Sequence, residues 1–320
     1  MHDAFVLAAG FGTRLKPLTL VRPKPLVPVC GVPMLSYALA LCATHGLERV
    51  MVNAHYLGDQ LVPWAGRHEG IRVTINQESP DILGTGGGLK AVEAQLAPKV
   101  VVVNADTLCD VDLTALRAAV PDGGGAMALR VDPADAAERY GVVAYDDEDR
   151  ITDLKKLAVV DPVGRVHTDA HFTGIHALDR QMLNHVPDGF SCIVRTAYIA
   201  EVPRRNVVAV RHGGTWLDVG DPQAYLQTNL AVLHGLVNLP LDPWDRAAGG
   251  VRVGEQSTVD GGVLHGPVWL GQGAKVHGSA RRSIIGAGAH VPSGADLDEC
   301  VVWEGVHVPA GVHRRQVFHA

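Results

Sequence analysis

Short runs of apolar, mostly β-branched residues alternate with helical patterns over the first 240 residues of the chain. The first four of these runs are almost continuously apolar, as strands buried on both faces of a parallel sheet are. Helical patterns lie at residues 33–46, between Pro33 and Gly46, and in GGLKAVEAQLA at residues 87–97. This alternation predicts a doubly wound, mostly parallel α/β sheet with ligands at the carboxyl ends of its strands. The predicted strands are residues 4–8, 49–54, 71–76, 99–105 and 125–131.

The pattern changes after about residue 140. Three shorter runs, at residues 140–146, 150–154 and 171–178, predict an antiparallel insertion on the sheet. A helical pattern at residues 221–236 closes this part of the chain, and a stretch with proline and glycine follows it. We therefore expect one domain over residues 1–240 and a linker over residues 241–250.

Beyond Gly250, aliphatic residues recur at six-residue steps with glycine close by. The hexapeptides VGEQST, LGQGAK and IGAGAH begin at Val253, Leu270 and Ile285. Hexapeptides with inward aliphatic side chains predict a left-handed parallel β-helix of about four coils over residues 251–320. The repeat breaks near residues 278–283 and 298–303. So short a helix has little core of its own. We therefore expect it to rest on another surface, to mediate a homo-oligomer and to take no part in catalysis.

Charge and composition exclude several classes of partner. The net charge of −6 leaves no overall attraction for nucleic acid or an anionic membrane. The most apolar helical stretch, residues 34–43, is too short to span a bilayer, and the N-terminus lacks the basic region of a signal peptide. The 5 cysteines are far apart and odd in number, as expected for buried thiols in a reducing cytoplasm.

The loop after the first predicted strand carries the first candidate chemistry. It reads Gly10-Phe11-Gly12-Thr13-Arg14, and Pro23-Lys24-Pro25 follows it. A dinucleotide-binding turn needs a third glycine where this chain has Leu15, and the Walker A pattern is absent as well. Backbone N–H groups, a guanidinium and an ammonium together form a cradle for a triphosphate. The two prolines should hold Lys24 on a stiff, extended support.

GFGTRLKPLT followed by PKPLVPV resembles the signature of the sugar-1-phosphate nucleotidylyltransferases. LGTGGGLKAV (83–92) is similar to the family's second Gly-rich loop, which lies over the nucleoside base, and FTGIHAL (172–178) to its sugar-site strand. VVVNADTLCDVDL (101–113) and TWLDVGDPQAYLQTN (215–229) are similar to the segments that carry its two metal ligands. The resemblance covers residues 1–235 and implies a Rossmann-like nucleotidyltransferase fold. Family members that include mannose-1-phosphate guanylyltransferases also carry β-helix tails.

The resemblance implies transfer of a nucleoside monophosphate from a nucleoside triphosphate to a sugar 1-phosphate, with release of pyrophosphate. The attacking phosphate is already an anion, so catalysis is positioning and charge neutralisation without a general base. Arg14 would hold the leaving phosphates, and Lys24 would bridge the sugar phosphate and the α-phosphate. Asp106 and Asp218 would bind Mg²⁺, which prefers hard oxygen ligands. Either aspartate alone could instead be a turn former or a helix cap.

The resemblance also implies two sets of binding residues. This chain lacks the Glu-Lys-Pro triplet that many relatives carry, and Lys155 or Lys156 is the candidate substitute. The implied nucleotide-binding residues are Leu7, Ala9, Gly10, Gly12, Thr13, Arg14, Glu78, Gly84, Thr85 and Gly86. The implied sugar-binding residues are Asn104, Gly141, Lys155, Lys156, Thr173 and Gly174.

Several alternatives remain open. LGTGGG and NADTLCDVDL favour guanylyl transfer to mannose- or heptose-1-phosphate, whereas TGGG with FTGI also resembles the uridylyltransferase acting on N-acetylmuramic acid 1-phosphate. A regulatory subunit without catalysis should have lost the charged residues that this chain keeps. The tail histidines would allow an acyltransferase, although that activity usually needs a longer helix. His167 and His171 have the spacing of a zinc pair only if they lie on a helix, whereas their context indicates strands.

Overall fold

The computed structural model describes residues 1–68, 70–132, 134–243 and 250–319. The chain forms two compact units, and each is built from two separate segments. The first unit comprises Met1–Phe11 and Tyr37–Trp216, and the second comprises Gly12–Ser36 and Leu217–Ala320. This division differs from the boundary at residue 240 expected from composition, because the Gly-rich N-terminal segment groups with the C-terminal part of the chain.

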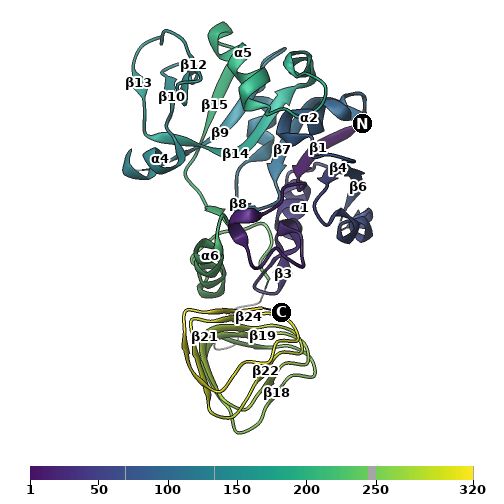
Figure 1. The fold of residues 1–320 in the computed structure, drawn as a ribbon. Coiled ribbons are helices and arrows are strands. Elements are labelled where there is room, and N and C mark those ends of the chain that lie inside the picture. The colour runs from purple at the N-terminus through teal and green to yellow at the C-terminus, as the bar shows by residue number, and fades with distance from the viewer. Residues whose placement is uncertain (69, 133, 244–249, 320) are drawn as a thin grey trace. The chain divides into compact units, whose positions relative to one another are not determined.

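The first unit is built on an eight-stranded mixed sheet with the strand order β15-β9-β14-β7-β1-β4-β6-β5 (Figure 1). Strands β7, β1, β4 and β6 are parallel, as their continuous apolar runs predict. Strand β14 is antiparallel to both of its neighbours, and β5 is antiparallel to β6. The bounds are β1 (His2–Leu7), β4 (Arg49–Ala54), β5 (Gly66–His68), β6 (Ile71–Gln77), β7 (Leu96–Asn104), β9 (Gly125–Val131), β14 (Ala170–Asp179) and β15 (Val207–His212).

Two sequence-based expectations change here. The run at residues 171–178, expected in an antiparallel insertion, is part of β14 and lies inside the main sheet. The insertion itself is a four-stranded antiparallel sheet with the order β12-β11-β10-β13. Its strands are β10 (Val143–Asp146), β11 (Ile151–Leu154), β12 (Ala158–Val159) and β13 (Val166–His167). The remaining short strands before residue 240 are β2 (Pro28–Val29), β3 (Val32–Pro33), β8 (Thr107–Cys109) and β16 (Trp216–Asp218).

Capping residues mark the two ends of helix α6. Helix α6 starts after Asp221, whose carboxylate accepts a hydrogen bond from the backbone N–H of Ala224 at 2.8 Å, and stops at Gly235 with φ of 69°. The expected helix at residues 87–97 is instead α2, which begins three residues earlier and ends at Ala91. The bounds are α1 (Met34–Thr44), α2 (Gly84–Ala91), α3 (Leu113–Ala118), α4 (Ala134–Tyr140), α5 (Ile199–Glu201) and α6 (Pro222–His234).

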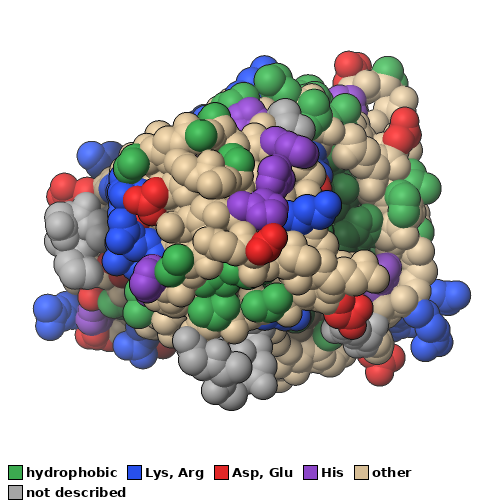
Figure 2. All heavy atoms as spheres, turned by 90° about the horizontal axis from the view of Figure 1, so that it is seen from below, with side chains coloured by type: hydrophobic (Ala, Val, Ile, Leu, Met, Phe, Trp, Pro, Cys, Tyr) green, Lys and Arg blue, Asp and Glu red, His purple; other side chains and the backbone are tan. Residues whose placement is uncertain are grey.

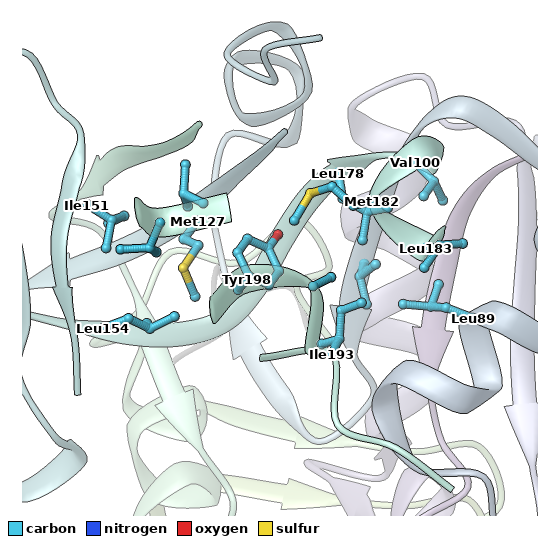
Figure 3. Close-up of a cluster of buried hydrophobic side chains, with 14 of the residues drawn as sticks. Leu89, Val100, Met127, Ile151, Leu154, Leu178, Met182, Leu183, Ile193 and Tyr198 are labelled. Carbon is cyan, nitrogen blue, oxygen red and sulfur yellow. The ribbon is translucent and has the colours of Figure 1, made fainter. Parts of the chain in front are cut away.

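A single apolar core joins the two sheets of the first unit (Figure 3). Ile151 and Leu154 from β11 face Met127 from β9, and Tyr198 lies at the centre of the cluster. Leu89 brings helix α2 into the same core, and its side chain is fully buried. Because α2 anchors here, the residues before it are fixed at the edge of the main sheet.

His176 is a titratable group inside this core, and it predicts acid sensitivity. Its Nδ1 lies 2.8 Å from the hydroxyl of Tyr198, and burial lowers its pKa to about 3. Below the ordinary histidine pKa of about 6.5, the unfolded chain binds a proton that the folded chain excludes. The free energy of unfolding should therefore fall as pH drops from 6.5 towards 3, by at most about 1.4 kcal/mol per pH unit. Denaturant titrations of the wild type and His176→Gln should give different pH slopes, and identical slopes would contradict this.

The second unit contains a stack of parallel strands, which we call the C-terminal strand stack (residues 251–318). Each strand pairs in parallel with the strand one coil further along, as Ser279 does with Asp296 (Figure 1). This arrangement is compatible with the β-helix expected from the hexapeptides. The bounds are β17 (Val251–Val253), β18 (Thr258–Val259), β19 (Val263–Leu270), β20 (Lys275–Val276), β21 (Ser279–Ile285), β22 (His290–Val291), β23 (Ala295–Asp298), β24 (Val301–Val302), β25 (Gly311–Arg314) and β26 (Val317–Phe318).

Most of the repeating aliphatic residues face the interior of the stack. Leu270, Val276 and Ile285 are fully buried in its core. Val253 and Val259 were expected to be buried but are 53% and 39% exposed, because they belong to the first coil among the described residues. The expected linker lies in part outside the described residues, since residues 244–249 are not described.

Three histidines stack on the surface of this part of the chain. The ring centroids of His277 and His290 are 5.3 Å apart, and those of His290 and His307 are 5.2 Å apart. Figure 2 shows histidine side chains gathered side by side on one face, next to side chains of both charges. Partial desolvation, followed by the neighbouring His307, His277 and Lys275, lowers the pKa of His290. No helix among the described residues is long and apolar enough to cross a membrane.

Candidate functional site

The carboxyl ends of four parallel strands bring the candidate residues of the first unit together. Leu7 at the end of β1 pairs with Asn104 at the end of β7, and Asn53 near the end of β4 pairs with Asn76 of β6. Ala9–Gly10, Glu78 and Asp106 follow directly after these strand ends. They therefore lie along one edge of the sheet, where parallel α/β proteins bind their ligands.

A buried carboxylate organises this edge. Glu78 is 4% exposed, and its two oxygens accept hydrogen bonds from the Asn53 amide and the Leu83 backbone N–H, both at 2.7 Å. The other end of the Asn53 amide accepts a hydrogen bond from the N–H of Ala8 at 2.7 Å. This network ties the loop after β1 to the start of α2. Glu78 was predicted to bind nucleotide directly, and the structure gives its carboxylate a role in shaping the site.

The glycines of residues 84–88 are required by protein packing. A Cβ on Gly86 would lie 2.8 Å from Ser191 Oγ and 3.0 Å from the Ile193 nitrogen, and one on Gly87 would lie 1.9 Å from the Gly189 carbonyl oxygen. The segment at residues 189–193 is held there by hydrogen bonds, including Gly86 N–H to the Ser191 carbonyl at 2.9 Å. The expected loop is therefore a helix start, and binding of the nucleotide by Gly84, Thr85 and Gly86 stays a prediction. The lack of side chains at the glycines admits another part of the chain.

Gly10 is different. No described protein atom lies within 4 Å of the position that a Cβ would take there. Its small size is therefore not explained by contacts with the described chain. It leaves the backbone at the end of β1 open to a ligand.

This contrast gives a matched pair of variants. We expect Gly86→Val to lower the free energy of unfolding by about 1–3 kcal/mol, because the added atoms overlap the backbone at Ile193. Gly10→Val should leave stability nearly unchanged and weaken triphosphate binding. Thermal unfolding and nucleotide titration by calorimetry would measure both effects. Normal nucleotide affinity in Gly10→Val would place the triphosphate elsewhere.

On the predicted sugar side, Gly174 lies directly against Asn104. Gly174 has φ of 87°, and a Cβ on it would lie 2.2 Å from Asn104 Nδ2, so only glycine fits in front of this amide. The pairing of β14 with β9 shifts register between Phe172 and His176, which places a bulge at Thr173 and Gly174. Bulges of this kind re-aim side chains next to active sites. The carbonyl of Thr173 also accepts a hydrogen bond from the Trp216 indole at 3.0 Å.

Asp106 lies in the two-residue turn between β7 and β8. Asp110, four residues later, was not among the predicted site residues, and it shapes the same region. Its carboxylate accepts a hydrogen bond from the backbone N–H of Thr215 at 2.7 Å, and a Cβ on Gly214 would lie 2.2 Å from it. Asp110 therefore fixes the chain just before the expected metal ligand Asp218. The only sequence signal for Asp110 was its position shortly after Asp106. Its hydrogen-bond partner Thr215 lies more than a hundred residues away in the chain, so the pairing could not be predicted.

Lys155 lies across Gly141. Its Nζ donates a hydrogen bond to the carbonyl of Tyr140 at 2.8 Å, and a Cβ on Gly141 would be 3.3 Å from its side-chain carbons. Desolvation lowers the pKa of Lys155. Lys155 and Lys156 are both exposed, and the backbone N–H of Lys156 donates to the Asp153 carboxylate at 2.6 Å. Of the two candidate lysines, Lys155 is therefore the one joined to another predicted sugar-site residue.

The second unit holds the remaining charged candidates. Arg14 lies in a 3₁₀ helix (Thr13–Leu15), and Asp218 ends β16. A Cβ placed on Gly220 would be 3.2 Å from Asp218 Oδ2 and 3.4 Å from Arg14 Nη1, so both groups converge beside this glycine. Because Asp221 caps α6, Asp218 does not serve as that cap. A guanidinium and a carboxylate side by side suit a phosphate with its metal ion.

Lys24 is 8% exposed, so its side chain is largely enclosed. The prolines do not hold it in an extended segment as expected, because Lys24–Leu26 forms a turn of 3₁₀ helix after an extended Pro23. Gly12 has φ of 61°, and a Cβ on it would lie 3.2 Å from Lys24 Cβ. The Gly-rich loop and the lysine therefore pack directly on each other, and Gly12 has a structural reason to be glycine.

His167 and His171 lie on β13 and β14 and do not share a helix, so the zinc spacing does not apply. The His171 ring is buried between Tyr140 and Trp216, with centroid distances of 4.7 and 4.8 Å. Among the described residues, no group of three or more His, Cys, Asp or Glu side chains forms a metal cage. A metal ion at this site would depend on ligands from the substrate as well.

Residues 3–235 match the family described as Nucleotidyl transferase. The chain belongs to this family. The match begins inside β1 and extends through β15, and it includes the Gly-rich segment with Arg14 and Lys24 and helix α6. It therefore includes every candidate site residue described above.

Relatives of this nucleotidyl transferase are similar along most of their length. It is 26% identical to the UTP--glucose-1-phosphate uridylyltransferase of Synechocystis sp. over 94% of this chain and 82% of that protein. It is 29% identical to the mannose-1-phosphate guanylyltransferase of Mycobacterium tuberculosis over 94% of this chain and 79% of that protein. The crystal structure of HddC from Yersinia pseudotuberculosis has the same fold, with a TM-score of 0.56 and 24% identity over 72% of this chain and 98% of that one.

Proposed function

We propose that this nucleotidyl transferase joins a sugar 1-phosphate to a nucleoside monophosphate. An oxygen of the sugar 1-phosphate attacks the α-phosphorus of a nucleoside triphosphate. The new P–O bond forms as the bond from that phosphorus to the leaving pyrophosphate breaks. The products are a nucleoside diphosphate sugar and pyrophosphate, and no oxidation or net proton transfer is needed. The convergence of Arg14 and Asp218 beside Gly220, in a chain of this family, is the observation that supports the proposal most.

Each charged residue has a separate task. Arg14 binds the phosphates that leave as pyrophosphate, and Lys24 bridges the sugar phosphate and the α-phosphate. The low exposure of Lys24 strengthens its interaction with a phosphate, because little water competes for its ammonium. Gly10 admits the triphosphate to the backbone N–H groups after β1. Asn104, Thr173 and Gly174 contact the sugar, and Lys155 supports that side through Gly141.

Asp106 and Asp218 would hold a divalent cation, and we propose Mg²⁺. The donor set fits this ion, because Mg²⁺ is usually bound by one or two carboxylates together with substrate phosphates and water rather than by a complete protein cage. When bound, the ion would supply neutralisation of phosphate charge. The protein's own contribution is the two carboxylates, with Asp106 in the turn before β8 and Asp218 at the end of β16.

The base and the sugar are proposed from the relatives. Proteins named mannose-1-phosphate guanylyltransferase recur among them, in Mycobacterium tuberculosis and in Oryza sativa, where the protein is named as a probable one. We therefore propose guanylyl transfer to mannose- or heptose-1-phosphate. Uridylyl transfer to another hexose phosphate is the alternative, because a uridylyltransferase is similar over the same length. A pyrophosphate-release screen of four nucleoside triphosphates against a panel of sugar 1-phosphates tests this. If no pair of nucleoside triphosphate and sugar 1-phosphate released pyrophosphate, the proposed activity would be contradicted.

We also propose that the C-terminal strand stack is a left-handed β-helix that mediates a homo-oligomer. Its parallel pairing and hexapeptide spacing support the first part, and the exposed apolar side chains of its first coil support the second. Light scattering of the full chain should give a mass above that of a monomer. The buried free thiols support a cytoplasmic location, as proposed from the sequence.

A further inference from the structure

The segment that carries Lys24 is a small folded unit, which we call the Lys24 hairpin (residues 22–33). After the 3₁₀ turn at Lys24–Leu26, strands β2 and β3 pair through a two-residue turn at Cys30 and Gly31, with φ of 46° and 73°. The backbone N–H of Val27 donates to the Lys24 carbonyl at 3.1 Å. Because these bonds join the lysine to the strands, a shift of the strands would move Lys24 with them.

Helix α6 holds the hairpin from one side. The hydroxyl of Tyr225 donates a hydrogen bond to the carbonyl of Pro28 at 2.6 Å, and the Asn229 side chain accepts one from the Cys30 backbone N–H at 2.8 Å. Tyr225 and Asn229 are fully buried, so each bond is protected from competition by water. The position of the hairpin therefore depends on how Tyr225 is oriented.

The C-terminal strand stack fixes that orientation. The indole N–H of Trp303 donates to the Tyr225 hydroxyl at 2.9 Å, and Trp303 is 3% exposed. The Tyr225 oxygen thus accepts from the stack and donates to the hairpin in one continuous chain of hydrogen bonds. A phenol held by both an acceptor and a donor has one preferred direction for its proton.

Three further contacts join the stack to the hairpin directly. Glu304 forms an ion pair with Arg22, whose guanidinium lies 4.9 Å from the Trp303 ring centroid. The Trp269 ring lies against Gly31, where an added Cβ would be 2.1 Å from a ring carbon. Neither Trp269 nor Trp303 belongs to the cluster of buried residues described for the interior of the stack.

A cavity of about 300 Å³ lies among these same contacts, lined by Arg22, Gly31, Tyr225, Trp269, Trp303 and Glu304 among others. The hairpin is therefore not held by continuous packing. A few directional contacts carry the connection, and the loss of one of them is not compensated by close-packed neighbours.

We propose that the C-terminal strand stack positions Lys24 for catalysis through Trp303 and Glu304. This inference rests on the proposed function of Lys24. It also replaces the expectation that the tail takes no part in catalysis. Trp303 and Glu304 are positioning residues, since they act through Tyr225 and Arg22 and do not reach the substrate. A misplacement of a reacting group by about 1 Å can reduce turnover by about a hundredfold, so modest shifts of the hairpin are enough.

Trp303→Phe tests the proposal in the protein with its C-terminal strand stack intact, because it removes the N–H donor and keeps a smaller aromatic ring in its place. We expect kcat to fall about 5- to 10-fold while KM for both substrates stays within about twofold. Glu304→Gln should act in the same direction, and Glu304→Asp should restore part of the loss by keeping the charge. Steady-state kinetics and thermal unfolding would be measured for each variant.

Glu299→Gln is the matched control. Glu299 forms ion pairs with Arg282 and Arg315 within the stack. Its replacement therefore also removes a carboxylate from an ion pair, but at a place that does not contact the hairpin. Its kcat should equal that of the wild type. A normal kcat in Trp303→Phe, an equal loss in Glu299→Gln, or a rise in KM alone would each overturn the positioning proposal. Lys24→Ala, measured alongside, separates the two ideas. If it retains full turnover, the proposed role of Lys24 fails, whatever the other variants do.

Discussion

Lys24→Ala should reduce kcat by at least two to three orders of magnitude and leave the protein folded. An enclosed ammonium that meets charge developing on the reacting phosphates stabilises the transition state more than the bound substrates. Loss of one such group typically costs about 10²–10³ in kcat. The effect should appear in kcat and in kcat/KM together, measured by coupled pyrophosphate release.

Lys16→Ala is the matched control for this variant, because Lys16 lies in the same N-terminal segment and is exposed. Its kinetic constants should remain close to those of the wild type. If Lys24→Ala changed only KM, the lysine would be a uniform binding contact, and its assignment to the reacting phosphates would be wrong.

Asp106→Asn and Asp218→Asn should each abolish magnesium-dependent turnover. A neutral amide has the size of the carboxylate but is a poor ligand for a hard cation, so the fold should survive while the metal is lost. The losses should not be additive in the double variant, because both residues serve one ion and the phosphates bound to it. Turnover and Mg²⁺ titration would be measured for the single and double variants.

Asp122→Asn provides the control for charge alone, since the Asp122 side chain is fully exposed to solvent. It should have normal activity and a normal response to Mg²⁺. Full activity in either site variant would remove that aspartate from the metal site. Additive losses in the double variant would indicate two separate tasks in place of one shared ion.

The sequence predicts strands best where burial on both faces decides their composition. The apolar runs of β4 and β9 have the bounds that their patterns predict, since nearly every position must be apolar. Prediction from the sequence fails where contacts with a distant part of the chain decide the local structure. A run of glycines disfavours a helix, yet α2 begins at Gly84 because residues 189–193 pack against it. The alternation in residues 171–178 likewise gives no sign of which sheet the strand will join.

In the candidate site too, residues defined by a local motif can be predicted, and residues that depend on a distant partner cannot. Gly10, Arg14 and Lys24 can be recognised from the sequence because the residues next to them in the chain form the same short motifs. Asp110 and Thr215 are 105 residues apart in the sequence, so only the folded structure brings them together. The packing of Gly86 against Ser191 and Ile193 was not predicted, because a glycine gives no indication of which neighbour requires its small size.

The pairing of Gly12–Ser36 with Leu217–Ala320 in one compact unit also has a meaning for biosynthesis. Residues 12–36 leave the ribosome long before their partners Tyr225, Trp303 and Glu304 are made. The chain must therefore carry its phosphate-binding segment without these contacts while the residues between them are translated, at roughly 5–20 residues per second. Contacts between such distant residues also form late in folding because they close long loops. A nascent chain arrested before Trp303 thus has its motif but not the support that we infer for Lys24, so activity should appear only after Trp303 has been made.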